Sequence, residues 1–257
     1  MDYGLTGKVA VVPGGTSGLG LATARALAAE GARVVIGGRR GELAAELAAG
    51  LPDAVGIGVD IMAPGGVDAL VEAATSAYGP VDVLVLNGGG PPPATAAGMS
   101  AEDTKAAVER LLLPHVGLVR AVLPGMRERG WGRIVAIGSS GIQAPIDGLA
   151  ASNVGRAALA GYLKTLATEV AADGVTVNLV LPGRIRTDRL DSLNEATARR
   201  EGVTVAEVDA ATRALIPAGR YGTADEFGAV VAFLASQAAS YVTGTQLRCD
   251  GGLVRAH

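Results

Sequence analysis

Near its start, the chain runs from a short apolar segment into a glycine-rich turn and then into a segment with helical periodicity. The turn reads Pro13-Gly14-Gly15-Thr16-Ser17-Gly18-Leu19-Gly20. Glycines at Gly14, Gly18 and Gly20 allow a tight connection and let other groups approach the backbone where a side chain would obstruct them. A glycine trio alone is a weak signal. Between a strand and a helix, however, it is typical of parallel α/β sheets, and it limits the chain to that class.

The rest of the chain repeats this alternation of short apolar runs and longer segments with helical periodicity. We expect strands at Val9–Val12, Arg33–Ile36, Ala54–Val59, Val81–Leu86, Arg133–Ile137, Thr176–Leu181 and Gln246–Cys249. We expect helices at Leu19–Ala29, Glu42–Ala49, Val67–Tyr78, Ser100–Arg129 (with Ser100 as its N-cap), Leu149–Ala172 and Thr223–Ala235. Regular alternation favours a parallel sheet covered on both faces, joined by right-handed crossovers. We therefore predict one doubly wound α/β Rossmann-type domain over residues 1–257, with a mostly parallel, seven-stranded sheet.

Residues 184–218 interrupt this alternation. The segment is polar and irregular with some helical character, and it follows the end of the sixth expected strand. Ligands of open α/β sheets bind beyond the carboxyl ends of the strands. We interpret the segment as a possible substrate lid, with a simple surface excursion as the alternative.

Composition argues against several classes of function. Aromatic residues make up 3% of the chain and a single cysteine, Cys249, rules out an internal disulfide and fits a reducing compartment. With two histidines and one cysteine a zinc site has few ligands, and a net charge of -3 without a basic stripe does not suggest nucleic acid. No apolar run reaches the ~20 residues of a membrane span, and Met1–Lys8 lacks the pattern of a secretion signal. We expect a cytoplasmic protein that binds a small molecule, with no metal, nucleic acid or membrane.

The glycine turn can hold the phosphates of a dinucleotide, with a tight turn that binds no ligand as the alternative. A helix N-terminus offers free N–H groups and a positive dipole end, and the hydroxyls of Thr16 and Ser17 add donors. Arg39 follows the second strand, where sites for NAD usually carry an acid, and its planar fork suits a 2′-phosphate. This favours NADP (NADPH) over NAD, with a solvated arginine beside a turn as the alternative. Asp60 suits an adenine amino group, and Asn87–Gly89 suits the cofactor ribose.

A series of motifs runs in order along nearly the whole chain. They are the glycine turn, Asp60, Asn87-Gly88-Gly89, Gly132-Arg133-Ile134-Val135 leading to Ser139, Val177-Asn178, Pro182-Gly183, Thr187, Gly219-Arg220-Tyr221-Gly222 with Glu226, and Asp250-Gly251-Gly252. In this order they resemble the short-chain dehydrogenase/reductase family, and specifically members similar to 3-oxoacyl-carrier-protein reductases. The resemblance implies a nicotinamide-dependent dehydrogenase or reductase that forms a homodimer or homotetramer. The cofactor-binding positions it implies are Gly14, Thr16, Ser17, Gly18, Leu19, Gly20, Arg39, Asp60, Ile61, Asn87, Gly88, Gly89, Arg156, Pro182, Gly183, Ile185 and Thr187.

The family's chemistry uses four residue types. Ser holds the substrate oxygen, Tyr exchanges the proton, Lys lowers the pKa of that Tyr and binds ribose, and Asn helps to hold a relay water. The resemblance places the Ser on Ser139, the Tyr position on Ser152, the Lys position on Arg156 and the Asn position on Leu111. Three of the four positions therefore depart from the pattern. The first tyrosine after Ser139 is Tyr162, nearly three helical turns beyond Ser152, too far to substitute.

These departures bear on proton transfer. A serine hydroxyl is far less acidic than tyrosine, whose pKa is near 10, and arginine stays protonated. Ser139, Ser152 and Arg156 are the candidate catalytic residues, and they equally fit a polar anion pocket that binds without reacting. His115, four residues after Leu111 and expected on the same helical face, and Asp147, expected at the border of the pocket, are further acid–base candidates. A structural histidine and a capping or solvated carboxylate are the alternatives.

Three functions follow from this pattern. The first is an NADP-dependent oxidoreductase acting on a carbonyl/alcohol pair with a divergent proton donor. The second is an enzyme of the same fold with non-redox chemistry, such as a dehydratase, isomerase or cyclase. The third is a ligand-binding pseudoenzyme without catalysis. We take the first as the main hypothesis because the cofactor edge is largely preserved.

Overall fold

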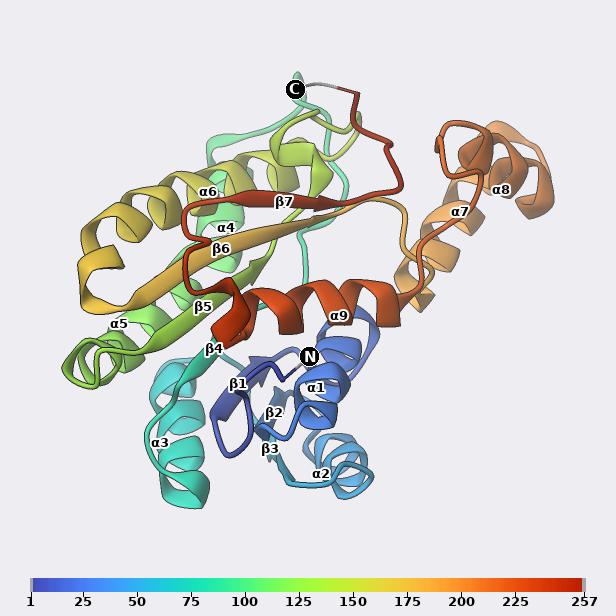
Figure 1. The fold of residues 1–257 in the computed structure, drawn as a ribbon. Coiled ribbons are helices and arrows are strands. Elements are labelled where there is room, and N and C mark those ends of the chain that lie inside the picture. The colour runs from blue at the N-terminus through green and yellow to red at the C-terminus, as the bar shows by residue number, and fades with distance from the viewer. Residues whose placement is uncertain (1, 256–257) are drawn as a thin grey trace.

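A seven-stranded parallel sheet forms the centre of the computed structural model, which describes residues 2–255 (Figure 1). The strands are β1 (Val9–Pro13), β2 (Arg33–Gly38), β3 (Ala54–Gly58), β4 (Val83–Leu86), β5 (Gly132–Ile137), β6 (Val175–Pro182) and β7 (Gln246–Cys249). Their order across the sheet is β3-β2-β1-β4-β5-β6-β7. All six neighbouring pairs are parallel. The predicted doubly wound Rossmann fold is confirmed.

Helices cover both faces of this sheet. They are α1 (Gly18–Ala29), α2 (Gly41–Ala49), α3 (Gly66–Tyr78), α4 (Ala101–Leu111), α5 (Leu113–Glu128), α6 (Ala150–Val170), α7 (Asp188–Glu201), α8 (Val205–Ala214) and α9 (Ala224–Ala235). Helices α1, α2 and α9 pack on one face, and α3, α5 and α6 pack on the other. Side chains alternate along each strand, so Val11 and Val35 join the second face while Val12 and Ile36 join the first. Each large aliphatic side chain buried in this way contributes about 1.5–3 kcal/mol.

The long helix predicted over Ser100–Arg129 is wrong, because the segment forms two helices. Ser100 does cap the first of them, through a capping box in which its hydroxyl accepts from the Asp103 N–H. Helix α4 ends at Leu111 and α5 begins at Leu113, with Pro114 in its first turn. Proline has no N–H and its ring clashes with the carbonyl four residues earlier, so Pro114 favours the start of a new helix here, whereas Pro124 is accommodated inside α5.

The segment 184–218 is more regular than its sequence suggests. It contains α7, capped by the Thr187 hydroxyl, and α8, which begins with a capping box between Thr204 and Glu207. Both helices project outward from the sheet body (Figure 1). Their polar composition misled the expectation of an irregular segment, because most of their side chains face solvent. Whether the segment acts as a lid remains a prediction.

The sheet order reverses direction at β1. The chain leaves β1 for β2 and β3 on one side and returns to place β4 on the other side. Parallel sheets bind ligands beyond the carboxyl ends of the strands at such a switch point. Here the Asn87 side chain, just after β4, donates hydrogen bonds to the Pro13 carbonyl at 3.1 Å and the Gly14 carbonyl at 3.2 Å. These bonds join the two strand ends and fix the floor of the crevice.

Candidate active site

One cavity of about 1300 Å³ lies at the carboxyl ends of the strands. Every cofactor-binding position proposed from the sequence lines it, together with the candidate catalytic residues Ser139, Ser152 and Arg156. These are Gly14, Thr16, Ser17, Gly18, Leu19, Gly20, Arg39, Asp60, Ile61, Asn87, Gly88, Gly89, Ser139, Ser152, Arg156, Pro182, Gly183, Ile185 and Thr187. The structure thus brings the glycine turn and the candidate catalytic residues into a single space, while the role of each remains a prediction.

The glycine turn packs too closely for side chains. Gly14 and Gly18 have φ angles of 61° and 52°, which disfavour any residue with a Cβ atom. A Cβ at Gly20 would lie against the Gly14 carbonyl oxygen and 2.6 Å from the Asn87 Nδ2 atom. Ser17 is the N-cap of α1 but its side chain makes no cap hydrogen bond. The first N–H groups of α1 therefore face the cavity uncapped, ready for an anion.

The end of β2 supplies two guanidinium groups. Arg39 and Arg40 are both exposed and both line the cavity. Arg40 Nη2 lies 3.4 Å from the Thr16 hydroxyl oxygen, so Arg40 reaches back over the glycine turn. Asp60, after β3, accepts a hydrogen bond from the Met62 N–H at 3.0 Å. Within residues 2–255, no acid pairs with Arg39 or Arg40, so both are available to a phosphate.

Two serine hydroxyls face the opposite part of the cavity. Ser139 follows β5, and its Oγ accepts from the Gly141 N–H at 3.0 Å. Ser152 is buried on α6, and its Oγ accepts from Arg156 Nε at 3.3 Å. Neither hydroxyl donates to another group among the hydrogen bonds of the described residues. Each oxygen is therefore positioned by an N–H while its own proton remains free for a ligand.

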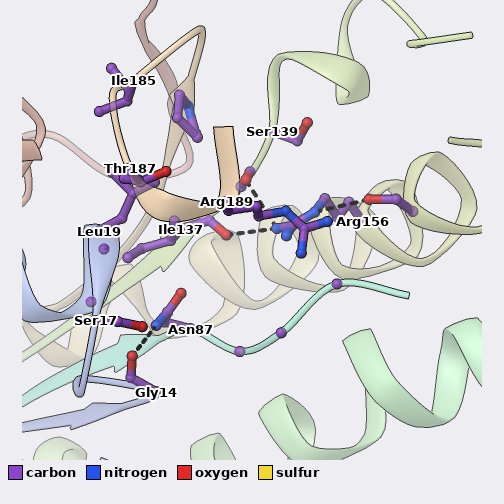
Figure 2. Close-up of a pocket in the computed structure, with 18 of the residues that line it drawn as sticks. Gly14, Ser17, Leu19, Asn87, Ile137, Ser139, Arg156, Ile185, Thr187 and Arg189 are labelled. Carbon is purple, nitrogen blue, oxygen red and sulfur yellow. Dashed lines mark hydrogen bonds between the residues drawn. The ribbon is translucent and has the colours of Figure 1, made fainter. Parts of the chain in front are cut away.

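Arg156 is held by the backbone of β5. Its Nη1 donates to the Ile137 and Gly138 carbonyls, both at 3.0 Å (Figure 2). Burial, together with the smaller effect of the nearby charge of Arg189, lowers the pKa of Arg156 to about 10. The guanidinium nevertheless stays protonated at neutral pH. It places a fixed positive charge beside Ser152.

Comparison with known proteins decides the family. A family model described as Enoyl-(Acyl carrier protein) reductase matches residues 14–254. The 3-oxoacyl-acyl-carrier-protein reductase of Vibrio cholerae is 37% identical over 251 residues, which cover 97% of this chain and 98% of that protein. The chain belongs to the short-chain dehydrogenase/reductase family. The resemblance deduced from the motifs is confirmed.

Solved structures of the same family superpose on the chain over nearly its whole length. L-sorbose reductase from Gluconobacter frateurii, in complex with NADPH and L-sorbose, matches with a TM-score of 0.94 and 33% identity, covering 100% of both chains. A variant of actinorhodin polyketide ketoreductase with NADPH matches with a TM-score of 0.89 and 36% identity, covering 96% of this chain and 97% of that one.

Leu111, the position that the resemblance assigns to the family's Asn, is buried and apolar. Its side chain packs against α6 at Gly155. A Cβ at Gly155 would lie 2.8 Å from Leu111 Cδ1 and 2.9 Å from the Ala107 carbonyl oxygen. The glycine next to Arg156 thus makes room for the leucine. Close packing between α4 and α6 leaves no polar side chain at Leu111.

His115 and Asp147 do not reach the cavity. His115 is 3% exposed, and its Nδ1 hydrogen-bonds to the Leu111 carbonyl at 2.9 Å although the two residues lie in different helices. Burial lowers the pKa of His115, so the buried imidazole is neutral at neutral pH. Asp147 is exposed and lies outside the cavity lining. Asp147 thus lies at the border of the cavity, between the lining residues Ile146 and Leu149, without contributing to the lining. The structure favours a structural histidine and a solvated carboxylate at these two positions.

Sequence reasoning missed the extra arginines of the cavity. Besides Arg39 and Arg156, the lining includes Arg40, Arg110, Arg184, Arg189 and Arg255. No Tyr, Lys, His or Cys lines it among residues 2–255. Arg40 could have been found beside Arg39 in the sequence. The other four come from α4, the β6–α7 connection, α7 and the C-terminal segment, whose convergence no local pattern reveals.

Two further properties can be read from residues 2–255. No helix in this range is long and apolar enough to cross a membrane. No group of three or more His, Cys, Asp or Glu side chains in the same range is arranged to hold a metal ion.

Proposed function

We propose that the chain is an NADPH-dependent reductase that converts a carbonyl group to an alcohol with a divergent proton donor. The observation that carries the proposal is the single cavity in which the glycine turn and the β2 arginines meet Ser139, Ser152 and Arg156. The family of the chain supports a dehydrogenase or reductase, and two solved relatives were determined with NADPH.

The residues present fit this cofactor. The absence of room for a Cβ at Gly14 and Gly20, together with the uncapped start of α1, makes a cradle for a pyrophosphate. Arg39 and Arg40 would hold the 2′-phosphate, and Asp60 would accept from the adenine amino group. Ile61, Asn87, Gly88, Gly89, Pro182, Gly183, Ile185 and Thr187 would enclose the remainder. When bound, NADPH supplies a hydride, which carries both electrons of the reduction.

The chain's own residues then stabilise the oxygen of the carbonyl. The free protons of Ser139 and Ser152 can both be donated to this oxygen, which becomes negatively charged as hydride reaches the carbon. Arg156 supports Ser152 through its Nε and adds a fixed positive charge. The proton that completes the alcohol comes from water in the cavity, because Arg156 retains its own. The net reaction joins carbonyl, NADPH and one proton to give alcohol and NADP⁺.

Titration of the protein into NADPH, followed by cofactor fluorescence, tests the proposal first. We expect binding below about 1 mM, the upper end of usual KM values. A panel of aldehydes and ketones should then show protein-dependent loss of absorbance at the NADPH band. No binding at that concentration would overturn the reductase assignment.

A double substitution tests the divergent proton donor. Ser152→Tyr combined with Arg156→Lys restores the family's two residue types at these positions. General acid catalysis contributes about 10²–10⁴-fold, so we expect a faster reaction on any carbonyl that the original protein reduces. Leu111 and Gly155 remain packed beside these positions in the double variant. If the variant binds NADPH but reduces no carbonyl, the pocket does not support proton donation by a tyrosine at position 152.

A ligand-binding role is the second candidate. It is favoured by one observation, that no Tyr, Lys, His or Cys lines the cavity in the described part of the chain. NADPH binding without turnover across the whole panel would favour this role.

The homodimer or homotetramer implied by the family is also a proposal. The mass of the protein in solution, measured by light scattering, would test it.

A further inference from the structure

The cavity carries a charge opposite to that of the whole molecule. Seven arginines line it (Arg39, Arg40, Arg110, Arg156, Arg184, Arg189 and Arg255), against two acids, Asp60 and Asp188. The chain as a whole has a net charge of -3. None of the seven arginines forms an ion pair within residues 2–255, whereas Arg186, Arg199 and Arg220 outside the cavity do. The positive charges of the cavity are thus left without internal partners.

Arg156 and Arg189 form the most pronounced case. Their side chains lie side by side, Arg156 extending from α6 and Arg189 from α7 (Figure 2). A Cβ at Gly90, in the loop after β4, would lie 3.0 Å from Arg189 Nη2. After burial, the nearby charge of Arg189 is the second cause that lowers the pKa of Arg156. Like charges this close are unfavourable unless an anion lies between or beside them.

Both guanidinium groups keep free donors. Arg156 uses Nε and Nη1 for Ser152, Ile137 and Gly138, and its Nη2 has no acceptor among the described hydrogen bonds. This Nη2 atom is not fully buried, and Arg156 lines the cavity, so the donor is open to a ligand. Arg189 donates no hydrogen bond to any described residue, and it is exposed. Planar guanidiniums with free N–H groups match the paired oxygens of a carboxylate or phosphate.

We propose that Arg156 and Arg189 bind an anionic group, a carboxylate or a phosphate, on the substrate, so that the enzyme reduces small carbonyl compounds that carry this charge near the carbonyl. The inference rests on the proposed function, because it places the anion beside Ser139 and Ser152. Their hydroxyls face the carbonyl oxygen while the arginine pair holds the charged end of the same molecule.

The phosphates of the cofactor have other partners. The uncapped start of α1 and the glycine turn suit the pyrophosphate, and Arg39 and Arg40 suit the 2′-phosphate. Arg189 points toward Arg156 and away from Gly14 (Figure 2). A role of Arg189 toward the cofactor is nevertheless the alternative that the experiment must separate, because Thr187, two residues earlier, lies near Gly18.

The experiment compares charged and uncharged substrates in the original protein and in Arg189→Ala. Acetoacetate is paired with methyl acetoacetate, and dihydroxyacetone phosphate with dihydroxyacetone, all at saturating NADPH. Loss of a hydrogen bond to a charged group costs about ten- to a hundredfold. We expect Arg189→Ala to lower kcat/KM by at least about tenfold for one of the charged compounds, leaving its uncharged counterpart within about twofold. The pair that responds identifies the carboxylate or the phosphate as the recognised group.

Arg199→Ala is the matched control. Arg199 lies on the same helix and is paired with Glu195 outside the cavity. Its substitution by alanine removes the same charge as Arg189→Ala. We expect Arg199→Ala to leave kcat/KM for all four compounds and the Kd of NADPH unchanged. Equal losses for charged and uncharged compounds in Arg189→Ala, or a weaker Kd of NADPH that accounts for the whole effect, would overturn the inference.

A binding measurement keeps the inference separate from the reductase proposal. The shift in Tm caused by acetoacetate and by dihydroxyacetone phosphate is recorded with NADP⁺ present and with no cofactor. A shift that depends on Arg189 in a protein that reduces nothing would retain the anion site and reject the reductase. Reduction of uncharged carbonyls as efficiently as of charged ones, without any Arg189-dependent shift, would retain the reductase and reject the anion site.

Discussion

We expect single residues at the end of β2 to decide which nicotinamide cofactor the site prefers. Arg39→Glu replaces a free guanidinium with a carboxylate beside the expected 2′-phosphate. We predict that Arg39→Glu weakens the binding of NADPH by at least about tenfold and leaves the binding of NADH nearly unchanged, as measured by cofactor fluorescence. Arg40→Glu should weaken the binding of both NADPH and NADH, because Arg40 also contacts Thr16 in the glycine turn.

Arg25→Glu provides the control for charge alone. Arg25 is exposed on α1 and lies outside the cavity lining. Arg25→Glu should leave the affinities for NADPH and NADH unchanged. If Arg39→Glu weakened NADPH and NADH to the same degree, Arg39 would not recognise the phosphate.

Individual site residues were predictable where their position follows from the sequence nearby. Gly14, Gly18 and Gly20 lie within one turn, and Ser139 directly follows a strand, so the fold alone brings them to the carboxyl edge. Arg189 was not predictable in this way. Its place beside Arg156 depends on the path of α7 relative to α6, two helices joined through β6. Side-chain convergence of this kind has no local signature in the sequence.

Among the secondary-structure elements, α4 and α6 pack closely at the position that the resemblance assigns to the family's Asn. Leu111 occupies the space that a side chain at position 155 would need. The departure at Leu111 therefore has a structural partner in Gly155, and the two residues belong to one rearranged contact. Restoring polarity at position 111 alone would leave this packing defective.

Two glycines of α6 allow this contact to be tested. Gly155→Ala should overpack the contact, with a loss of about 1–3 kcal/mol, because Leu111 Cβ and the Ala107 carbonyl are too close to give way. Gly161→Ala in the same helix meets no atom within 4 Å. It should stabilise the helix by about 0.5–1 kcal/mol. Urea unfolding followed by circular dichroism measures both changes, and a stabilising Gly155→Ala would contradict the packing argument.

The elements themselves were largely predictable, with errors of one or two residues at most ends. The seven strands follow from short apolar runs, which a sheet buried on both faces requires. The failures came from longer segments. Apolar periodicity continues across Pro114, so the pattern hides the break between α4 and α5, while the polar surface of α7 and α8 hides two real helices.

The whole molecule combines a negative net charge with a positive cavity. A cleft lined by one sign of charge concentrates the field inside it, even when the molecule as a whole carries the opposite sign. Seven arginines against two acids therefore attract anions to the carboxyl edge of the sheet. Because the whole chain carries a net charge of -3, we expect the rest of the surface to disfavour nonspecific binding of polyanions. The charge distribution of the whole molecule would then favour small anionic ligands over large ones.

This distribution predicts how cofactor binding depends on salt. NADPH carries one phosphate more than NADH, so its affinity should fall more steeply as ionic strength rises and the screening length shrinks from ~10 Å at 0.1 M to ~3 Å at 1 M. We expect a loss of several-fold for NADPH between these limits and a smaller loss for NADH, measured by cofactor fluorescence. In Arg39→Glu the affinities for NADPH and NADH should fall equally steeply with ionic strength. Repeating the titration with potassium glutamate in place of chloride separates screening from chloride bound at the arginines. Parallel slopes for the two cofactors in the original protein would mean that the cavity charge does not act on the 2′-phosphate.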